Sequence, residues 1–183
     1  MKYTFLLIFF FIQTAAFAQS SGGPVEVTPA MEKNIRQDIE KEIVVLKQQM
    51  KNSQATDLHI EFATDTIRIE RYMEKYMDYD YSTAGMRAAT YDAAAQYDSL
   101  LNKYYKKLLL VLKPEDKKVL QQAQRAWLSY RDNELKLVAV VRKDAYSGGG
   151  TLQQLTDTGY YLDIIKSRTI ELYHHLSRAT QDQ

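Results

Sequence analysis

The sequence has no cysteine, few glycines and prolines, and almost no net charge. With Cys 0 among 183 residues, disulfides, thiolate catalysis and Cys-ligated zinc are excluded. Only 7 Gly and 3 Pro interrupt the chain, which favours a few long elements over many short strands. Lys plus Arg is 24 and Asp plus Glu is 23, so no strong field of one sign favours nucleic acid or an anionic membrane surface.

The first eighteen residues have the pattern of an export signal. Lys2 supplies a positive start, residues 5–12 are an uninterrupted apolar run, and Ala16-Phe17-Ala18 fits the small-x-small cleavage rule. The apolar run is too short to cross about 30 Å of hydrocarbon. We therefore expect residues 1–18 to be a signal peptide with no membrane span. The mature chain would begin at Gln19 and be periplasmic or secreted.

The rest of the chain has the periodicity of helices. Residues 19–29 are rich in Ser and Gly and predict a flexible leader. Five apolar stripes with steps of three and four residues follow, at residues 35–50, 58–76, 86–111, 120–141 and 155–176. These steps predict an all-α bundle of about five helices with antiparallel packing and no sheet. We expect a helical extension at 30–80, a helical domain at 82–178 and a tail at 179–183.

Three of the stripes contain one polar exception each. Asp65 interrupts the second stripe, Lys107 the third and Glu134 the fourth.

Catalytic and metal-binding templates are absent from the sequence. Residues 148–150 are a glycine run that follows a helix rather than a strand, so a linker is favoured over a phosphate cradle. His174 and His175 are adjacent and so face different sides of a helix. Asp78 and Asp80 lack the glycine and distal glutamate of a calcium loop. We expect no enzyme, no cofactor and no metal.

The densest group of polar and aromatic residues falls on the third and fourth helices. Asp98 and Asn102 lie one turn apart, and so do Trp127 and Arg131. One interpretation is a structural clasp, in which Arg131 bonds a partly buried carboxylate such as Asp98 on the neighbouring helix. The other is a recognition patch, because Trp and Arg are enriched in binding hot spots. We expect the clasp, because a Trp within an apolar stripe is usually part of the core.

These residues carry a resemblance to a known family. Asp98, Leu101, Asn102 and Tyr105 form an Asp-x-x-Leu-Asn-x-x-Tyr element, and residues 123–132 read AQRAWLSYRD. A Gly-Gly-Thr turn and an Arg-x-x-x-Leu element follow. Over about residues 82–178 the chain resembles the LprI-like family, called the lysozyme inhibitor LprI N-terminal domain. The residues that match its motifs and are expected to be mainly structural are Asp98, Asn102, Gln124, Arg125, Trp127, Tyr130, Arg131, Asp132 and Arg168.

The chain departs from the family pattern at four positions. Ala89, Leu135 and Tyr160 stand where members usually carry cysteines, and Gly85 stands where a helix-start Glu is usual. We infer that apolar packing replaces disulfides, each of which would stabilise the fold by about 2–4 kcal/mol. With glycine at position 85, the helix lacks the capping-box contact that a Glu there would make with Ser82.

The resemblance implies that the protein blocks a muramidase cleft and so protects the cell wall. Such a cleft holds two carboxylates, which a donor-rich loop suits. The best candidate is the segment from Arg142 to Gly150, with Arg142, Lys143, Tyr146 and Ser147 as partner-binding residues. An ordinary interhelical connection is the simpler interpretation of this segment.

The competing interpretation is a non-catalytic envelope module. Tyr72, Tyr76, Tyr79 and Tyr81 cluster near one helix end and could face a protein or a cell-wall glycan. Such tyrosines are also common at the edges of amphipathic helices.

Overall fold

A computed structural model describes residues 22–147 and 150–180. The predicted signal peptide lies outside the described residues. The helices are α1 (Pro29–Asn52), α2 (Asp57–Tyr79), α3 (Thr83–Val111), α4 (Pro114–Val141), α5 (Asp144–Ser147) and α6 (Thr151–Thr180).

The all-α prediction is confirmed, and local signals explain where helices begin. The Oγ1 atom of Thr28 accepts from the N–H of Met31 at 3.3 Å, and Pro29 occupies the first turn of α1. The Oγ atom of Ser82 accepts from the N–H of Gly85 at 3.0 Å and caps α3. The one-turn helix α5 was not predicted. No strand occurs in residues 22–147 or 150–180.

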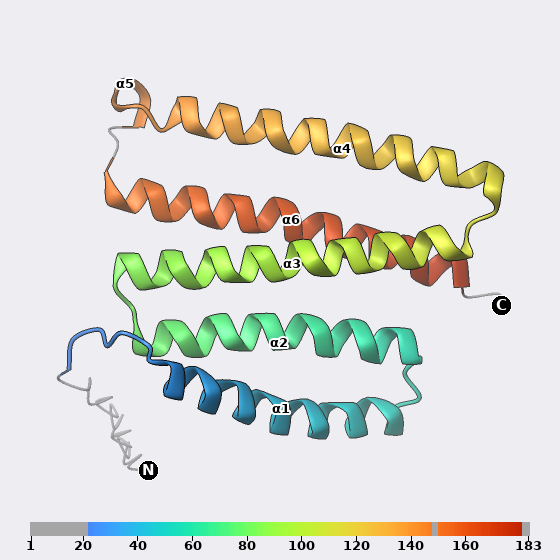
Figure 1. Cartoon of the computed structure of the whole chain (residues 1–183), viewed down its shortest axis with the longest axis horizontal. Coiled ribbons are helices and arrows are strands. Elements are labelled where there is room, and N and C mark those ends of the chain that lie inside the picture. The colour runs from blue at the N-terminus through green and yellow to red at the C-terminus, as the bar shows by residue number, and fades with distance from the viewer. Residues whose placement is uncertain (1–21, 148–149, 181–183) are drawn as a thin grey trace, which may run out of the picture.

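The long helices lie side by side in the order α1, α2, α3, α6 and α4 (Figure 1). Neighbours in the sequence run antiparallel, as predicted, but the central pair α3 and α6 runs parallel. Arg87 near the start of α3 donates to Gln154 near the start of α6 at 2.7 Å. Further along both helices, the rings of Tyr104 and Tyr173 lie 5.8 Å apart. Helix α4 runs antiparallel to α3 and returns the chain to the end of the bundle where α3 begins. Helix α6 therefore starts at that same end and runs parallel to α3.

The main core lies between α3 and α6. Tyr97 and Tyr104 from α3 and Ile165 and Leu172 from α6 are each at most 1% exposed. Rings from α2 and α6 extend this core, since Phe62 stacks on Tyr173 with centroids 3.8 Å apart. Most of the apolar stabilisation of the fold therefore comes from the pairing of the third and last long helices.

A second core cluster joins α1 to α2. Ile35, Ile39 and Ile43 pack with Tyr72 and with Val27, which precedes the first helix. The N–H of Val25 also donates to the carbonyl of Tyr79 at 2.9 Å. The described end of the predicted leader is therefore packed against the end of α2.

Helix α4 lies at the edge of the bundle and contacts it mainly through α6. Only Leu120 and Gln124 of this helix are buried. Exposed apolar side chains along α4 include Val119, Tyr130 and Leu137. The family motif on α4 is therefore closer to solvent than its apolar stripe predicts. None of the described helices is both long and apolar enough to cross a membrane.

Candidate functional site

The predicted partner-binding residues lie at the exposed end of the hairpin formed by α4 and α6. Helix α4 ends at Val141, and α5 forms a single turn beyond it (Figure 1). Tyr146 in this turn is 70% exposed, and Lys143 and Ser147 are exposed as well. The glycines 148–149 lie outside the described residues.

An ion pair fixes the base of this hairpin end. The Nη1 atom of Arg142 donates to Oδ2 of Asp157 on α6 at 2.8 Å. One of the two predicted cations is thus engaged within the protein. The side chain of Lys143 has no hydrogen bond or ion pair with any described residue, which leaves it available to another molecule.

The motif residues on α4 contact α6 through Arg168. Its Nε donates to Oε1 of Gln124 at 3.1 Å, and its Nη1 bonds Glu171 at 2.9 Å. Its guanidinium carbon lies 5.9 Å from the centroid of the Trp127 ring. Trp127 is half-buried and packs against the main core. The interhelical clasp of this motif therefore joins α4 to α6 through Arg168.

The predicted pairing of Arg131 with a carboxylate on α3 is wrong. Arg131 donates from Nε and Nη2 to Oδ1 of the adjacent Asp132, at 2.9 and 2.7 Å, and lies 5.5 Å from the Trp127 ring. Asp98 instead accepts from the side-chain amide of Asn102 at 3.2 Å. The reason is that α4 packs on α6, so Arg131 does not reach across to α3 and bonds the nearest carboxylate.

Residues of the motif from both helices nevertheless meet along one surface. They line a groove of about 500 Å³ between α3 and α4, which we call the α3–α4 groove. Its walls are Asp98, Leu101, Asn102, Tyr105, Gln121, Gln124, Arg125, Trp127, Leu128 and Arg131. The structure thus brings together Asp98, Asn102, Arg125 and Trp127 as the sequence motif suggests, around a groove rather than in a clasp.

A second, smaller groove of about 320 Å³ lies on the other side of Trp127, between α4 and α6. Tyr130, Asp163 and Glu171 are among its walls. Asp132, the last residue of the motif, is exposed, and within residues 22–147 and 150–180 its side chain bonds only Arg131.

The positions that depart from the family pattern have individual explanations. At Gly85, an added Cβ would lie 2.1 Å from Cγ of Asp80, so this carboxylate occupies the space of a side chain. Ala89 is buried and Leu135 is half-buried, which fits apolar packing. Tyr160 is 38% exposed and donates to Glu134 at 3.2 Å, so a polar contact occurs at that position.

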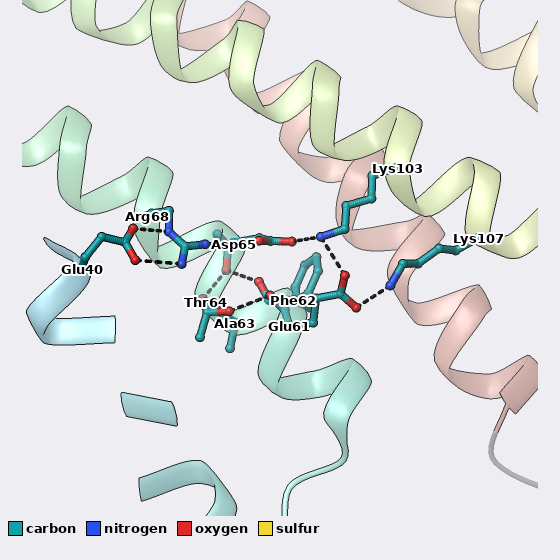
Figure 2. A network of polar contacts seen from close by, with 10 residues as sticks. Glu40, Glu61, Phe62, Ala63, Thr64, Asp65, Arg68, Lys103 and Lys107 are labelled. Atoms are coloured by element: carbon teal, nitrogen blue, oxygen red, sulfur yellow. Dashed lines mark hydrogen bonds and ion pairs between the residues drawn. The ribbon is translucent and has the colours of Figure 1, made fainter. Parts of the chain in front are cut away.

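Polar networks between the helices were not predicted, although the polar exceptions in the stripes signalled them. Asp65 accepts from Lys103 and bonds Arg68, which in turn holds Glu40 of α1 (Figure 2). Lys107 donates to Glu61. Together with the bond between Tyr160 and Glu134, every polar exception has a partner on another helix.

Charge pairing shifts the pKa values of this network, which joins α1, α2 and α3. Burial disfavours ionised Glu61, but hydrogen bonds from Lys103 and Lys107 outweigh it and hold the pKa of this carboxyl below its usual range. Burial likewise opposes the charge on Lys103, and the bonds to Asp65 and Glu61 raise its pKa nevertheless. The network therefore favours the charged forms at neutral pH.

The tyrosine cluster near the end of α2 is only partly a surface. Tyr72 is 4% exposed and belongs to the second core cluster, and Tyr76 is half-buried against it. Tyr79 and Tyr81 are about half exposed, at 46% and 51%. The hydroxyl of Tyr81 donates to the carbonyl of Gly22 at 2.8 Å. The proposed aromatic face is therefore reduced to two residues.

Fold and site together define an all-α protein with a shallow polar groove and an exposed helical hairpin end. The sequence profile of one known family, described as lysozyme inhibitor LprI, matches residues 74–172. The chain belongs to this family, and the match runs from the end of α2 through most of α6. No curated protein and no solved structure is significantly similar to the chain.

Proposed function

We propose that the protein is exported and inhibits a lysozyme by placing the end of the α4–α6 hairpin in the enzyme's active-site cleft. Membership of the lysozyme inhibitor family supports inhibition as the activity. The exposed turn that holds Lys143, Tyr146 and Ser147 supports the choice of surface, because a convex element is needed to enter a cleft. The export pattern of residues 1–18 supports a periplasmic or secreted location.

The chemistry of this turn suits a cleft with two carboxylates. A lysozyme cleft holds one protonated and one ionised carboxyl group. Lys143 offers an ammonium donor, and Tyr146 and Ser147 offer hydroxyls that donate or accept. Tyr146 also contributes a rigid aromatic surface, of the kind that dominates binding energy at interfaces. The ion pair between Arg142 and Asp157 holds the turn in place before binding.

A cell-wall turbidity assay tests the activity. The chain from Gln19 onward is mixed with a c-type lysozyme, and the expected result is slower clearing at inhibitor concentrations up to tens of micromolar. No slowing in that range would end the proposal for this enzyme class, because the affinity would then be weaker than about −6 to −7 kcal/mol.

Paired variants test the assigned surface. Tyr146→Ala and Lys143→Ala are expected to weaken inhibition at least tenfold with unchanged melting temperature. Tyr91→Ala is the matched control, because Tyr91 is 50% exposed on α3, outside the hairpin. Inhibition that survives both hairpin variants would show that another surface contacts the enzyme.

A further inference from the structure

The α3–α4 groove contains polar side chains whose hydrogen-bonding capacity the protein does not use. Arg125 and Gln121 are exposed, and neither side chain makes a hydrogen bond or ion pair with any described residue. Among the described residues, Asp98 accepts only from the amide of Asn102, one turn away on its own helix. Donors on α4 therefore face a groove that also holds a carboxylate and an amide oxygen on α3.

The charge of the groove does not select a strongly charged ligand. Asp98 and Arg125 have opposite signs, and Arg131 is already paired with Asp132. A phosphate-rich ligand would need unopposed cations. A ligand that offers several neutral donors and acceptors matches this arrangement better, because carboxylate, amide and guanidinium groups can each bind hydroxyl and amide groups.

The apolar part of the groove completes this match. Trp127 and Leu128 form an apolar wall beside the polar groups, whereas Leu101 lines the groove but is only 2% exposed. The volume of about 500 Å³ lies in the range of small-molecule sites. We propose that the α3–α4 groove binds a glycan of N-acetylated amino sugars. Its C–H faces pack on the apolar wall, and its hydroxyl and acetamido groups bond Asp98, Asn102, Gln121 and Arg125.

This site is separate from the surface proposed for lysozyme. Arg131 is the groove residue nearest the hairpin end, and it lies ten residues before Val141, where α4 ends. This corresponds to about 15 Å along the helix at about 1.5 Å per residue. Glycan binding therefore does not depend on lysozyme inhibition, and either proposal can fail without the other.

The neighbouring groove between α4 and α6 fits a glycan less well. Its volume is about 320 Å³, and several of its polar groups are already paired. Glu171 bonds Arg168, and the hydroxyl of Tyr160 bonds Glu134. Asp163 also lines this groove and provides a matched carboxylate for the test below.

Tryptophan fluorescence gives a direct test, because Trp127 is the single Trp of the chain and lies between the two grooves. The exported chain is titrated with the tetramer of N-acetylglucosamine, and with maltotetraose as a sugar without acetamido groups. We expect a saturable change in emission with a Kd of about 0.1–1 mM for the first sugar and at least tenfold weaker binding of the second. No change up to about 10 mM, or equal binding of both sugars, overturns the proposal.

Variants locate the bound sugar. Asp98→Asn and Arg125→Ala are each expected to weaken binding at least fivefold without changing the melting temperature, because neither side chain bonds another helix. Asp163→Asn should leave the Kd within twofold of the original. Loss of binding in Asp163→Asn with retention in Asp98→Asn would place the sugar in the other groove and overturn the assignment. The glycan proposal is also overturned if the emission of Trp127 changes with lysozyme but not with the sugar.

Discussion

The guanidinium of Arg168 on α6 donates from Nε to Oε1 of Gln124 on α4 across 3.1 Å, and both residues are only 9% exposed. This contact attaches the edge helix to the centre of the bundle. The same guanidinium lies beside the ring of Trp127, so one side chain holds two residues of the family motif in place.

Replacement of Arg168 by Ala should destabilise the protein. The change leaves the buried amide oxygen of Gln124 without its donor and removes packing against Trp127. Each effect costs about 1–3 kcal/mol, and we expect a loss of about 2–4 kcal/mol in the free energy of unfolding. Urea denaturation followed by circular dichroism measures it. A loss below about 0.5 kcal/mol would show that this contact does not stabilise α4.

Replacement of Arg131 by Ala should destabilise the protein less than replacement of Arg168. The partner of Arg131 is Asp132 on the same helix, whose side chain is 55% exposed and stays hydrated when the arginine is removed. Such a pair is worth about 0–1 kcal/mol, and the lost contact of Arg131 with the Trp127 ring adds about 0.5–1 kcal/mol. The same denaturation measurement is expected to give a loss of about 0.5–2 kcal/mol for this variant. A loss as large as that of Arg168→Ala would instead indicate that Arg131 reaches a buried carboxylate.

Acid should weaken the contacts among α1, α2 and α3. The pKa of Glu61 is lowered in the folded state, so its contribution is complete above the ordinary value of 4.5 and is lost as the pH falls through the lower folded value. The melting temperature should therefore decrease as the pH drops below about 4.5. In Glu61→Gln the decrease should be smaller, which thermal melts from pH 7 to pH 3 would show. An unchanged slope would mean that Glu61 does not couple protonation to folding.

The same network predicts the behaviour at high pH. The pKa of Lys103 is raised above its ordinary value of 10.5, so its stabilising contribution is complete below that value and is lost at still higher pH. Between pH 6 and pH 9 this network should therefore add no pH dependence to the melting temperature. Thermal melts of Lys103→Met against the unmodified chain across that range are expected to give a constant difference.

Two glycines in helices should respond to alanine in opposite ways. At Gly85 the new Cβ would lie 2.1 Å from Cγ and 2.5 Å from the carbonyl oxygen of Asp80, so Gly85→Ala should lower stability by about 1–3 kcal/mol. At Gly159 nothing lies within 4 Å, so Gly159→Ala should raise stability by about 0.5–1 kcal/mol. Melting temperatures of the two variants measure this contrast. Stabilisation by both would show that Asp80 moves aside easily.

The sequence alone determined the helices, because their signals are local. Thr28 with Pro29, Ser82, and Pro114 mark three helix starts in the structure, and apolar steps of three and four residues identify the faces that meet the core. The family motif was equally visible as a string of letters. Capping and periodicity depend on residues a few positions apart, so they need no knowledge of the rest of the fold.

Only the tertiary structure decided which helices meet and what the motif residues contact. The parallel pairing of α3 and α6, the attachment of α4 through Arg168 and the α3–α4 groove all join residues far apart in the sequence. The hydrogen bonds and ion pairs of Asp65, Lys107 and Glu134 also join residues on different helices, far apart in the sequence. A helix stripe specifies that a face is buried but not against which neighbour, because any apolar surface of suitable shape satisfies the hydrophobic effect. The choice depends on how all the long helices pack at once.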